Sequence, residues 1–524
     1  MSIHNAVGVT HEIKAPSTAD YPNGRSSCGS IVSISELTIN TLEEGSDIKT
    51  ASGPTIIDWD GPDDPQNPLN WSFKRKWGAT AIVSAYTFMT VVSSSIVAPA
   101  SNHVAKDFGM ANSVAIAMVT SIFVLGYAFG PLFIAPLSEI YGRSWVLQLA
   151  NLFYLVCNIA CAFSKTQGEL IAFRFLAGLG GSAPFAIEGG MMADCWRSEE
   201  RGQAIALYSL VPLLGNVIGP VAGSWIAEKA SWRWIFWSTT IADGVVQVFG
   251  LIFLRETFAL LLLERKANRI KKQLGIPDDD QSRMRTVYQS PERHWRRIFT
   301  KAIARPFAIF AREPIVQLLG LYLAFTFGII FLLLTTIPSI FQNTYHFRIG
   351  IAGLHYISLG IGLSIANQLS ARITDRVYAY LKKRNGGIGQ PEFRLPMMVV
   401  GTIFLPVGLL LTGWSAELAA PWILPDIGIA FVGAGMVLNF QGTQTYIMDV
   451  FTIYSASGLA AVTCLRSLTG FGFPLFAPAM YETLGYGKSC TILALAAIVL
   501  GCPAPWLFWH FGERIRSKSR YIAD

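Results

Sequence analysis

The chain has 524 residues, of which 52% are hydrophobic and only 14% are charged, and its net charge is +7. Soluble proteins carry about 25% charged residues, so this composition excludes an ordinary soluble domain and indicates a protein that crosses the membrane several times. The basic residues lie in loops between apolar runs, so membrane topology explains the positive charge better than a nucleic-acid partner does.

The residues before the first apolar run are polar and predict a cytosolic N-terminal tail over 1–76, largely disordered. Because no apolar run begins before Trp77, a cleavable signal peptide is not expected. The stretch from Asp58 to Trp71 is rich in Pro, Asp and Asn, which favour turns, and we expect it to lie at the membrane surface.

Apolar segments of membrane-spanning length follow, since a helix needs about 20 residues to cross the hydrocarbon core. Six lie near 77–99, 114–135, 145–163, 168–192, 204–227 and 234–254, and six more near 314–338, 350–371, 395–414, 423–448, 457–480 and 488–510. They predict an all-α membrane protein with an N-terminal six-helix half over 77–254, a cytosolic linker loop over 255–313, a C-terminal six-helix half over 314–510 and a cytosolic C-terminal tail over 511–524.

The loops also indicate orientation and internal symmetry. Most Lys and Arg residues lie in the two tails and in the loops after every second segment, so both termini are expected in the cytosol. Met191–Asp194, which closes the fourth segment, is similar to Tyr446–Asp449, which closes the tenth. This repeat favours two related halves.

The fifth segment is apolar but carries glycines at every fourth position. Gly215, Gly219 and Gly223 form one bare stripe on a helix, where a neighbouring helix can approach closely. Pro220 has no N–H group, so the helix tends to bend there. The alternative is an ordinary packing face of small residues.

Charged side chains inside the apolar segments are few and cost about 2.5–3.5 kcal/mol each at the membrane centre, so they usually face a partner or a cavity. At 1.5 Å per residue, Asp243 lies about 14 Å into the sixth segment and Glu188 about 9 Å from the end of the fourth. Because burial disfavours a charged carboxylate, both residues are candidates for proton binding in coupled transport. The alternatives are a structural pair for Asp243 and an interfacial carboxylate for Glu188.

Amides, aromatic residues and one arginine at membrane depth predict a binding site for a mostly apolar substrate. The candidates are Asn439, Gln441, Gln444, Tyr446, Arg466, Tyr322 and Phe325. For each amide, hydrogen bonding between helices is the alternative.

Charged residues at the cytosolic ends of the second and fourth segments predict a gate. Its candidates are Glu139, Gly142, Arg143, Asp194 and Arg201. Exposed ion pairs contribute only about 0–1 kcal/mol each, which suits a transporter whose two states must stay nearly balanced. The alternative is that these charges only set the topology.

In order and spacing, these motifs resemble those of the fungal drug:proton antiporter-1 family, the twelve-span exporters of the major facilitator superfamily. The resemblance is carried by Asp64–Trp71, Pro136–Arg143, Arg174, Gly215-x-x-x-Gly219-Pro220-x-x-Gly223, Trp232–Trp237, Glu256-Thr257 and Arg466-Ser467. It implies a major facilitator fold of two pseudo-symmetric halves, an antiporter motif in the fifth span, a latch function for the gate and a part in proton coupling for Arg174. Ser144 and Ser224 depart from the family pattern, which often has Arg and Gly there.

The sequence therefore predicts a secondary active transporter in the plasma membrane. We expect it to export a hydrophobic small molecule, such as a drug, toxin or secondary metabolite, in exchange for protons. The alternative is a proton-coupled importer or facilitator of a small organic solute. No ATP-binding, hydrolase or paired-cysteine motif is present, so we expect no enzyme activity, no cofactor, no metal and no nucleic-acid partner, and a monomer in the lipid bilayer.

Overall fold

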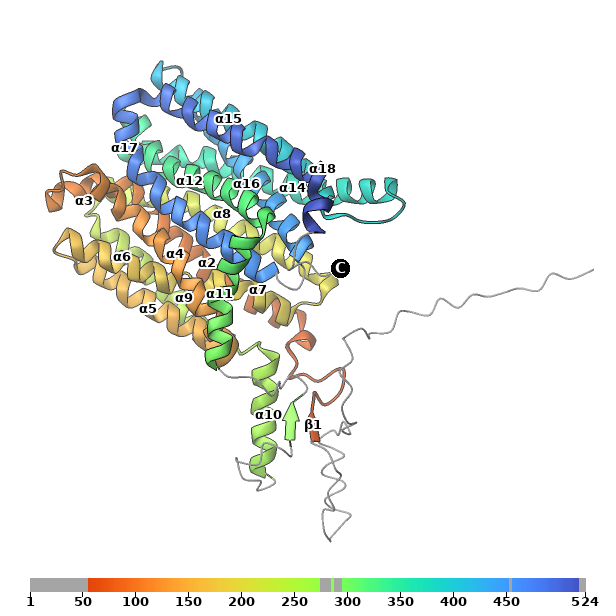
Figure 1. Cartoon of the computed structure of the whole chain (residues 1–524). Helices are drawn as coiled ribbons and strands as arrows, with labels where there is room; N and C mark the ends of the chain where they lie inside the picture. The colour runs from red at the N-terminus through yellow and green to blue at the C-terminus, as the bar shows by residue number, and fades with distance from the viewer. Residues whose placement is uncertain (1–54, 274–283, 287–294, 452–454, 518–524) are drawn as a thin grey trace, which may run out of the picture.

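The computed structural model describes residues 55–273, 284–286, 295–451 and 455–517. Within these ranges, 10 helical stretches are long and apolar enough to span a membrane. The last stretch, Ser457–Arg516, contains two spans, because α17 (Ser455–Gly501) is broken at Gly485, whose φ is 76°. Helix α8 (Ser198–Lys229) supplies the remaining span, and the predicted bundle of two six-helix halves is confirmed (Figure 1).

The N-terminal half follows the predicted segments closely, and local signals mark several of the helix ends. Gly109 adopts the left-handed conformation that ends one helix, and the side chain of Asn112 caps the next by accepting a hydrogen bond from the Val114 N–H. The fourth span is divided at Ser182, two residues before Pro184. The helices are α2 (Phe73–Ser95), α3 (Ser101–Phe108), α4 (Ser113–Tyr141), α5 (Arg143–Phe163), α6 (Gln167–Gly181), α7 (Ala183–Cys195), α8 and α9 (Arg233–Phe253), with the short 3-10 helices η1 (Pro68–Asn70) and η2 (Ala98–Ala100).

The C-terminal half differs from the prediction mainly in the length of one helix. Helix α14 continues to Arg384, well beyond the expected end at 371, because no Gly or Pro follows position 371 until Gly386. The elements of this half are α12 (Pro314–Asn343), α13 (Ile349–Leu354), α14 (Tyr356–Arg384), η3 (Pro391–Arg394), α15 (Pro396–Glu417), α16 (Ile423–Phe451), α17 and α18 (Pro503–Arg516).

The linker and the end of the N-terminal tail form a small ordered unit. Strand β1 (Thr55–Ile57) pairs in parallel with β2 (Met284–Thr286), beside α10 (Ala259–Gln273). The buried Lys266 of α10 binds Asp60 at 2.8 Å and donates a hydrogen bond to the Asp58 carbonyl at 2.9 Å. This unit projects from one end of the bundle, and α11 (Trp295–Arg312) leads from it into the C-terminal half (Figure 1).

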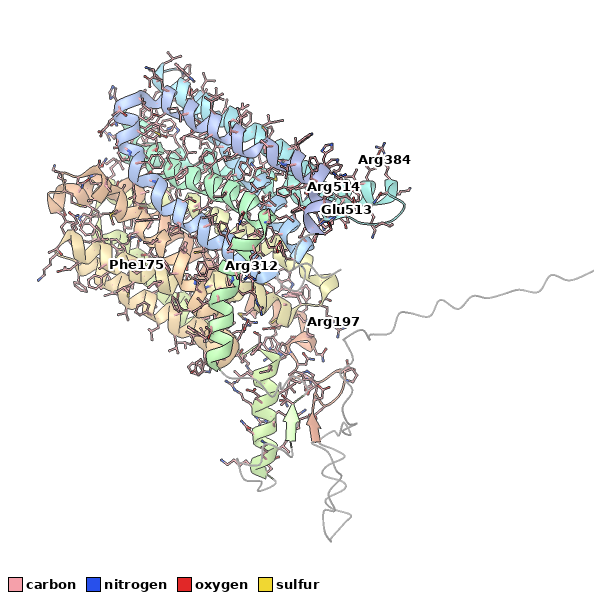
Figure 2. The ribbon with its side chains drawn as sticks, viewed as in Figure 1. Phe175, Arg197, Arg312, Arg384, Glu513 and Arg514 are labelled. Atoms are coloured by element: carbon pink, nitrogen blue, oxygen red, sulfur yellow. The ribbon has the colours of Figure 1, made fainter. Side chains whose placement is uncertain are left out.

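Basic residues gather at the same end. Arg197, Arg312, Arg384 and Arg514 all lie on the side of the bundle from which α10 and β1 extend, away from α3 (Figure 2). This is the end that the charge distribution predicts to be cytosolic.

The two halves are joined by a shared apolar core and by a polar contact near the opposite end. The core runs without interruption from Phe123 and Tyr154 in one half to Phe341 and Leu409 in the other. At the end where α3 lies, Glu228 of α8 accepts a hydrogen bond of 2.6 Å from the backbone N–H of Gly350, in α13.

Candidate functional site

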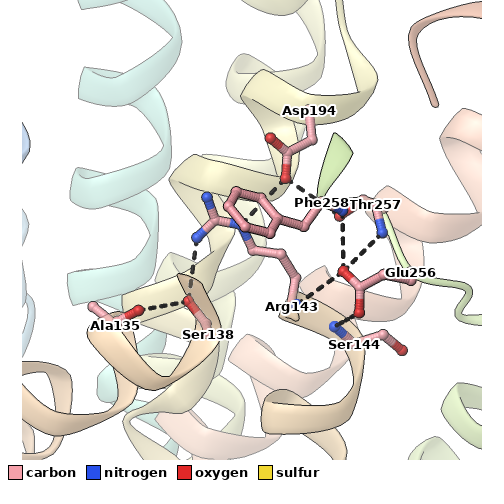
Figure 3. Close-up of polar contacts among 8 residues, drawn as sticks. All are labelled: Ala135, Ser138, Arg143, Ser144, Asp194, Glu256, Thr257 and Phe258. Atoms are coloured by element: carbon pink, nitrogen blue, oxygen red, sulfur yellow. Dashed lines mark hydrogen bonds and ion pairs between the residues drawn. The ribbon is translucent and has the colours of Figure 1, made fainter. Parts of the chain in front are cut away.

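A charged network joins three spans at the predicted cytosolic end (Figure 3). Arg143, the first residue of α5, binds Asp194 near the end of α7 with 3.2 Å between Nε and Oδ2. Its Nη1 donates to the Ser138 hydroxyl at 3.2 Å, and its guanidinium lies 5.0 Å from the centre of the Phe258 ring. Two of the gate candidates, Arg143 and Asp194, therefore form an ion pair between α5 and α7.

Glu256 completes this network, although the sequence analysis had not placed it in the gate. Its carboxylate accepts hydrogen bonds from the backbone N–H groups of Arg143 at 2.9 Å and Ser144 at 3.3 Å, at the N-terminus of α5. A carboxylate at a helix N-terminus satisfies free N–H groups and interacts favourably with the helix dipole. Its position directly after the sixth span was the available signal.

Gly142 makes this approach possible. Its φ is 103°, which disfavours any side chain, and a Cβ atom there would lie 2.3 Å from the Glu256 Oε2 atom. Glu139 is exposed, and the side chain of Arg201 lies outside the described residues.

The C-terminal half has a counterpart network built on a different position. Its central cation is Arg394, in η3 before α15. Arg394 binds Asp449 of α16 at 3.1 Å and Asp375 of α14 at 3.1 Å. Each half therefore ties its own helices together at the same end.

Asp243 lies in a buried polar ladder between α5, α9 and α2. Its Oδ2 accepts a hydrogen bond of 2.8 Å from Asn151, which also donates to Gln247 at 2.8 Å. Gln247 in turn binds Gln148 at 2.9 Å and Tyr86 at 3.0 Å. Asp243 has no exposed surface, and its Oδ1 has no hydrogen-bond partner among the described residues. The ladder encloses Asp243 within the N-terminal half.

Arg174 is also enclosed in this half. Its guanidinium donates to the backbone carbonyls of Ser93 at 2.8 Å, Val119 at 3.1 Å and Thr120 at 3.3 Å, and it lies 4.7 Å from the ring of Phe123. These bonds tie α6 to α2 and α4.

Glu188 and Arg466 lie where the two halves face each other. Glu188 belongs to α7 and Arg466 to α17, and their charges interact electrostatically. Among the described residues, the Glu188 Oε2 and Arg466 Nε atoms are buried and have no hydrogen-bond partner. Both side chains are only half-buried, and the guanidinium of Arg466 lies 4.9 Å from the ring of Phe327 and 5.2 Å from that of Phe440.

The other predicted substrate residues fall into two groups. Tyr322, Asn439 and Tyr446 lie inside the C-terminal half, since Tyr322 faces Gly501, Asn439 faces Gly401, and Tyr446 donates to Glu392 at 3.5 Å. Their burial corresponds to the alternative of contacts between helices.

Phe325 of α12 packs edge-on against Phe473 of α17, with 5.8 Å between the ring centroids. Gln441 and Gln444 are half-buried, and Gln441 donates a hydrogen bond to Asn367 of α14. Of the predicted substrate residues, Arg466 is the one that the structure brings opposite a charge of the other half.

The glycine stripe of α8 faces α2. A Cβ atom at Gly223 would lie 2.0 Å from the Ile96 carbonyl oxygen, and one at Gly219 would lie 2.5 Å from the Ser95 hydroxyl. The predicted close approach of a neighbouring helix is therefore present, and that neighbour belongs to the same half. Pro220 lies within the continuous helix.

A bundle of two six-helix halves, with ionisable side chains where the halves face each other, has the architecture of a multi-pass membrane transporter. The family model described as Major Facilitator Superfamily matches residues 83–474, and the chain belongs to this superfamily.

Relatives with similar sequences are fungal transporters. The efflux pump vrtL of Penicillium aethiopicum is 45% identical over 470 residues, covering 90% of this chain and 92% of that protein. The MFS-type transporter penM of Penicillium rubens is 42% identical, covering 92% of this chain and 93% of that protein. The predicted resemblance to fungal exporters of this superfamily is confirmed.

Solved structures agree with the fold. The xylose transporter XylE from E. coli, in a partially occluded inward-open conformation, has a TM-score of 0.63 and 15% identity, over 84% of this chain and 98% of that one. An inward-facing bacterial homologue of the human lysosomal transporter Spinster has a TM-score of 0.59 and 14% identity, over 87% of this chain and 100% of that one. At such identities the likeness concerns the fold alone.

Proposed function

We propose that this transporter exports a hydrophobic small molecule in exchange for protons, across the plasma membrane and with both termini in the cytosol. The efflux pump among its relatives and the glycine and proline pattern of α8 support export. The basic residues at the end of the bundle near α10 support the cytosolic placement of that end (Figure 2).

The observation that carries the coupling proposal is the position of Glu188. A group that exchanges protons between two sides must change its exposure when the halves rock, so it belongs where the halves face each other. Glu188 meets this condition, because it interacts with Arg466 of the other half and keeps one carboxylate oxygen without a partner among the described residues. Glu188 is therefore our first candidate for the proton carrier.

Asp243 is the second candidate. Its free Oδ1 can hold a proton, but the ladder around it belongs to one half and does not open when two rigid halves rock. Arg174 supports coupling indirectly in this proposal, by fixing the helices of the N-terminal half through backbone carbonyls.

Transport in sealed inside-out vesicles with an imposed pH gradient tests the proposal. We expect the wild type to accumulate a hydrophobic dye only with the gradient, and Glu188→Gln to lose this dependence while it still reaches the membrane. Asp243→Asn is the matched comparison, since an amide oxygen keeps the bond from Asn151. Accumulation that is equal with and without the gradient would favour the facilitator alternative. Gradient-driven uptake by the two variants at the wild-type rate would remove both proton-site assignments.

A further inference from the structure

The electrostatics around Glu188 and Arg466 define a substrate class, provided that the proposed exchange of substrate for protons holds. The two groups come from opposite halves and attract each other when both are ionised, and no direct ion pair joins them among the described residues. Buried polar atoms nearly always have hydrogen-bond partners, so an unpaired carboxylate oxygen on one half and an unpaired guanidinium N–H on the other point to a ligand that supplies both partners.

The surroundings describe the body of that ligand. Phe327 of α12 and Phe440 of α16 place their rings about the guanidinium of Arg466, at 4.9 and 5.2 Å. Phe185 lies on α7, three residues before Glu188, and is half-buried with its ring 5.4 Å from that of Tyr127. Aromatic residues beside Arg466 and one helical turn from Glu188 favour a flat, apolar scaffold.

The charges describe the polar groups of the ligand. Arg466 has only donors to offer, so its partner must be an acceptor such as a carbonyl oxygen. A deprotonated Glu188 has only acceptors, so its partner must be a donor such as a hydroxyl group. A proton on Glu188 removes the negative charge and occupies one acceptor site, which weakens the bond from the substrate's donor, so proton and substrate compete, as exchange requires.

Formal charge on the ligand is disfavoured in both directions. A permanent cation is repelled by Arg466, and a permanent anion is repelled by the deprotonated Glu188 that the competition requires. We propose that the Glu188–Arg466 pair selects electrically neutral aromatic compounds that carry a hydrogen-bond donor and an acceptor, and excludes permanent cations and anions.

Binding of one probe series to the purified full-length protein in nanodiscs tests this selection without any pH gradient. The probes are 2-(hydroxymethyl)anthraquinone, its O-methyl ether, anthraquinone-2-sulfonate and the corresponding trimethylammonium derivative. Wild-type protein should prefer the neutral alcohol, and loss of the donor in the ether should weaken binding by about tenfold. Equal binding of the four probes would overturn the proposal.

Two substitutions should change the charge preference in opposite directions. Arg466→Gln leaves Glu188 without its counter-charge and should admit the trimethylammonium probe, whereas Glu188→Gln should admit the sulfonate. Arg466→Lys keeps the charge and should still exclude the cation, which separates charge selection from bracing of α17. A folded Arg466→Gln protein that binds the neutral alcohol and still excludes the cation would refute the role of Arg466. Because binding needs no gradient, a failure of proton coupling in vesicles leaves this result unaffected.

Discussion

The approach of α8 to α2 predicts a graded loss of stability along the glycine stripe. In Gly223→Ala, the new Cβ atom would lie 2.0 Å from the backbone oxygen of Ile96, whereas ordinary contact begins at 3.4 Å. The obstacle is backbone, so the two helices must separate by more than 1 Å. Overpacking costs about 1–3 kcal/mol, and a clash with backbone belongs at the upper end of that range.

Other glycines provide a milder case and a control. A Cβ atom at Gly215 would lie 3.0 Å from side-chain atoms of Val91 and 3.3 Å from the Phe88 carbonyl oxygen. This overlap is smaller than that at Gly223, so Gly215→Ala should cost about 1 kcal/mol. Gly244 in α9 has nothing within 4 Å, and Gly244→Ala should stabilise the helix by about 0.5–1 kcal/mol.

Thermal unfolding of the purified proteins at one scan rate measures the series. With about 2–4 °C for each kcal/mol in a unit the size of one half, Gly223→Ala should lower the apparent Tm by about 6–12 °C. Because α2 and α8 belong to the same half, the folded fraction of this variant should still couple transport to the pH gradient. A Tm for Gly223→Ala that matches Gly244→Ala would refute the packing argument, and uncoupled transport at normal stability would refute the assignment of the contact to one half.

Three further predictions concern other parts of the chain. Arg143→Lys should slow transport severalfold at equal membrane abundance, because a lysine lacks the planar guanidinium group that binds Asp194 and the Ser138 hydroxyl at the same time. An unchanged initial rate of transport would contradict the latch function. In Gly353→Ala, the new Cβ atom would lie 2.4 Å from the Cβ atom of Ser224 in the other half. This clash should shift the protein towards the conformation that is open at the end near α3. Greater labelling of cysteines introduced on the face of α8 that contains Ser224 would report the shift. Burial raises the pKa of Glu392 in the folded protein above its ordinary value in the unfolded chain. The protonated carboxyl group therefore contributes its full stabilisation at pH values below the ordinary pKa. This stabilisation is lost as the pH rises through the raised pKa of the folded state. Glu392→Gln should therefore flatten the pH dependence of the Tm, and an unchanged slope would contradict this account.

The spans were predictable because they depend on local patterns. Apolar length located the helices, and the gate charges could be placed at neighbouring helix ends, but only the structure shows that Arg143 pairs with Asp194. Helix α14 ran past its expected end because apolar length marks where the membrane ends and not where hydrogen bonding ends.

The direction of polar side chains was much harder to predict. Amides that bind a substrate and amides that join two helices have the same composition and depth, so the sequence left both alternatives open for Asn439, and only the structure shows that its side chain lies against Gly401. A spacing pattern did exist for the ladder, since Gln148, Asn151 and Asn158 lie on one face of α5, but only the structure shows that this face meets Asp243 and its neighbours on α9.

The two faces of α8 explain why Ser224 does not weaken its packing. The glycine stripe contacts α2 within one half, and Ser224 is not part of that stripe. Ser224 instead meets Gly353 of the other half, while Val217 meets Gly360 there, so the small residues that permit close approach at this second face are supplied by α13 and α14. The Ser224 hydroxyl donates to the Pro220 carbonyl at 2.8 Å, which satisfies the serine within its own helix. Contacts on the first face persist while the halves rock, and contacts on the second face must form and break. Substitutions on the stripe should therefore change stability, whereas substitutions at the second face should change the balance between conformations.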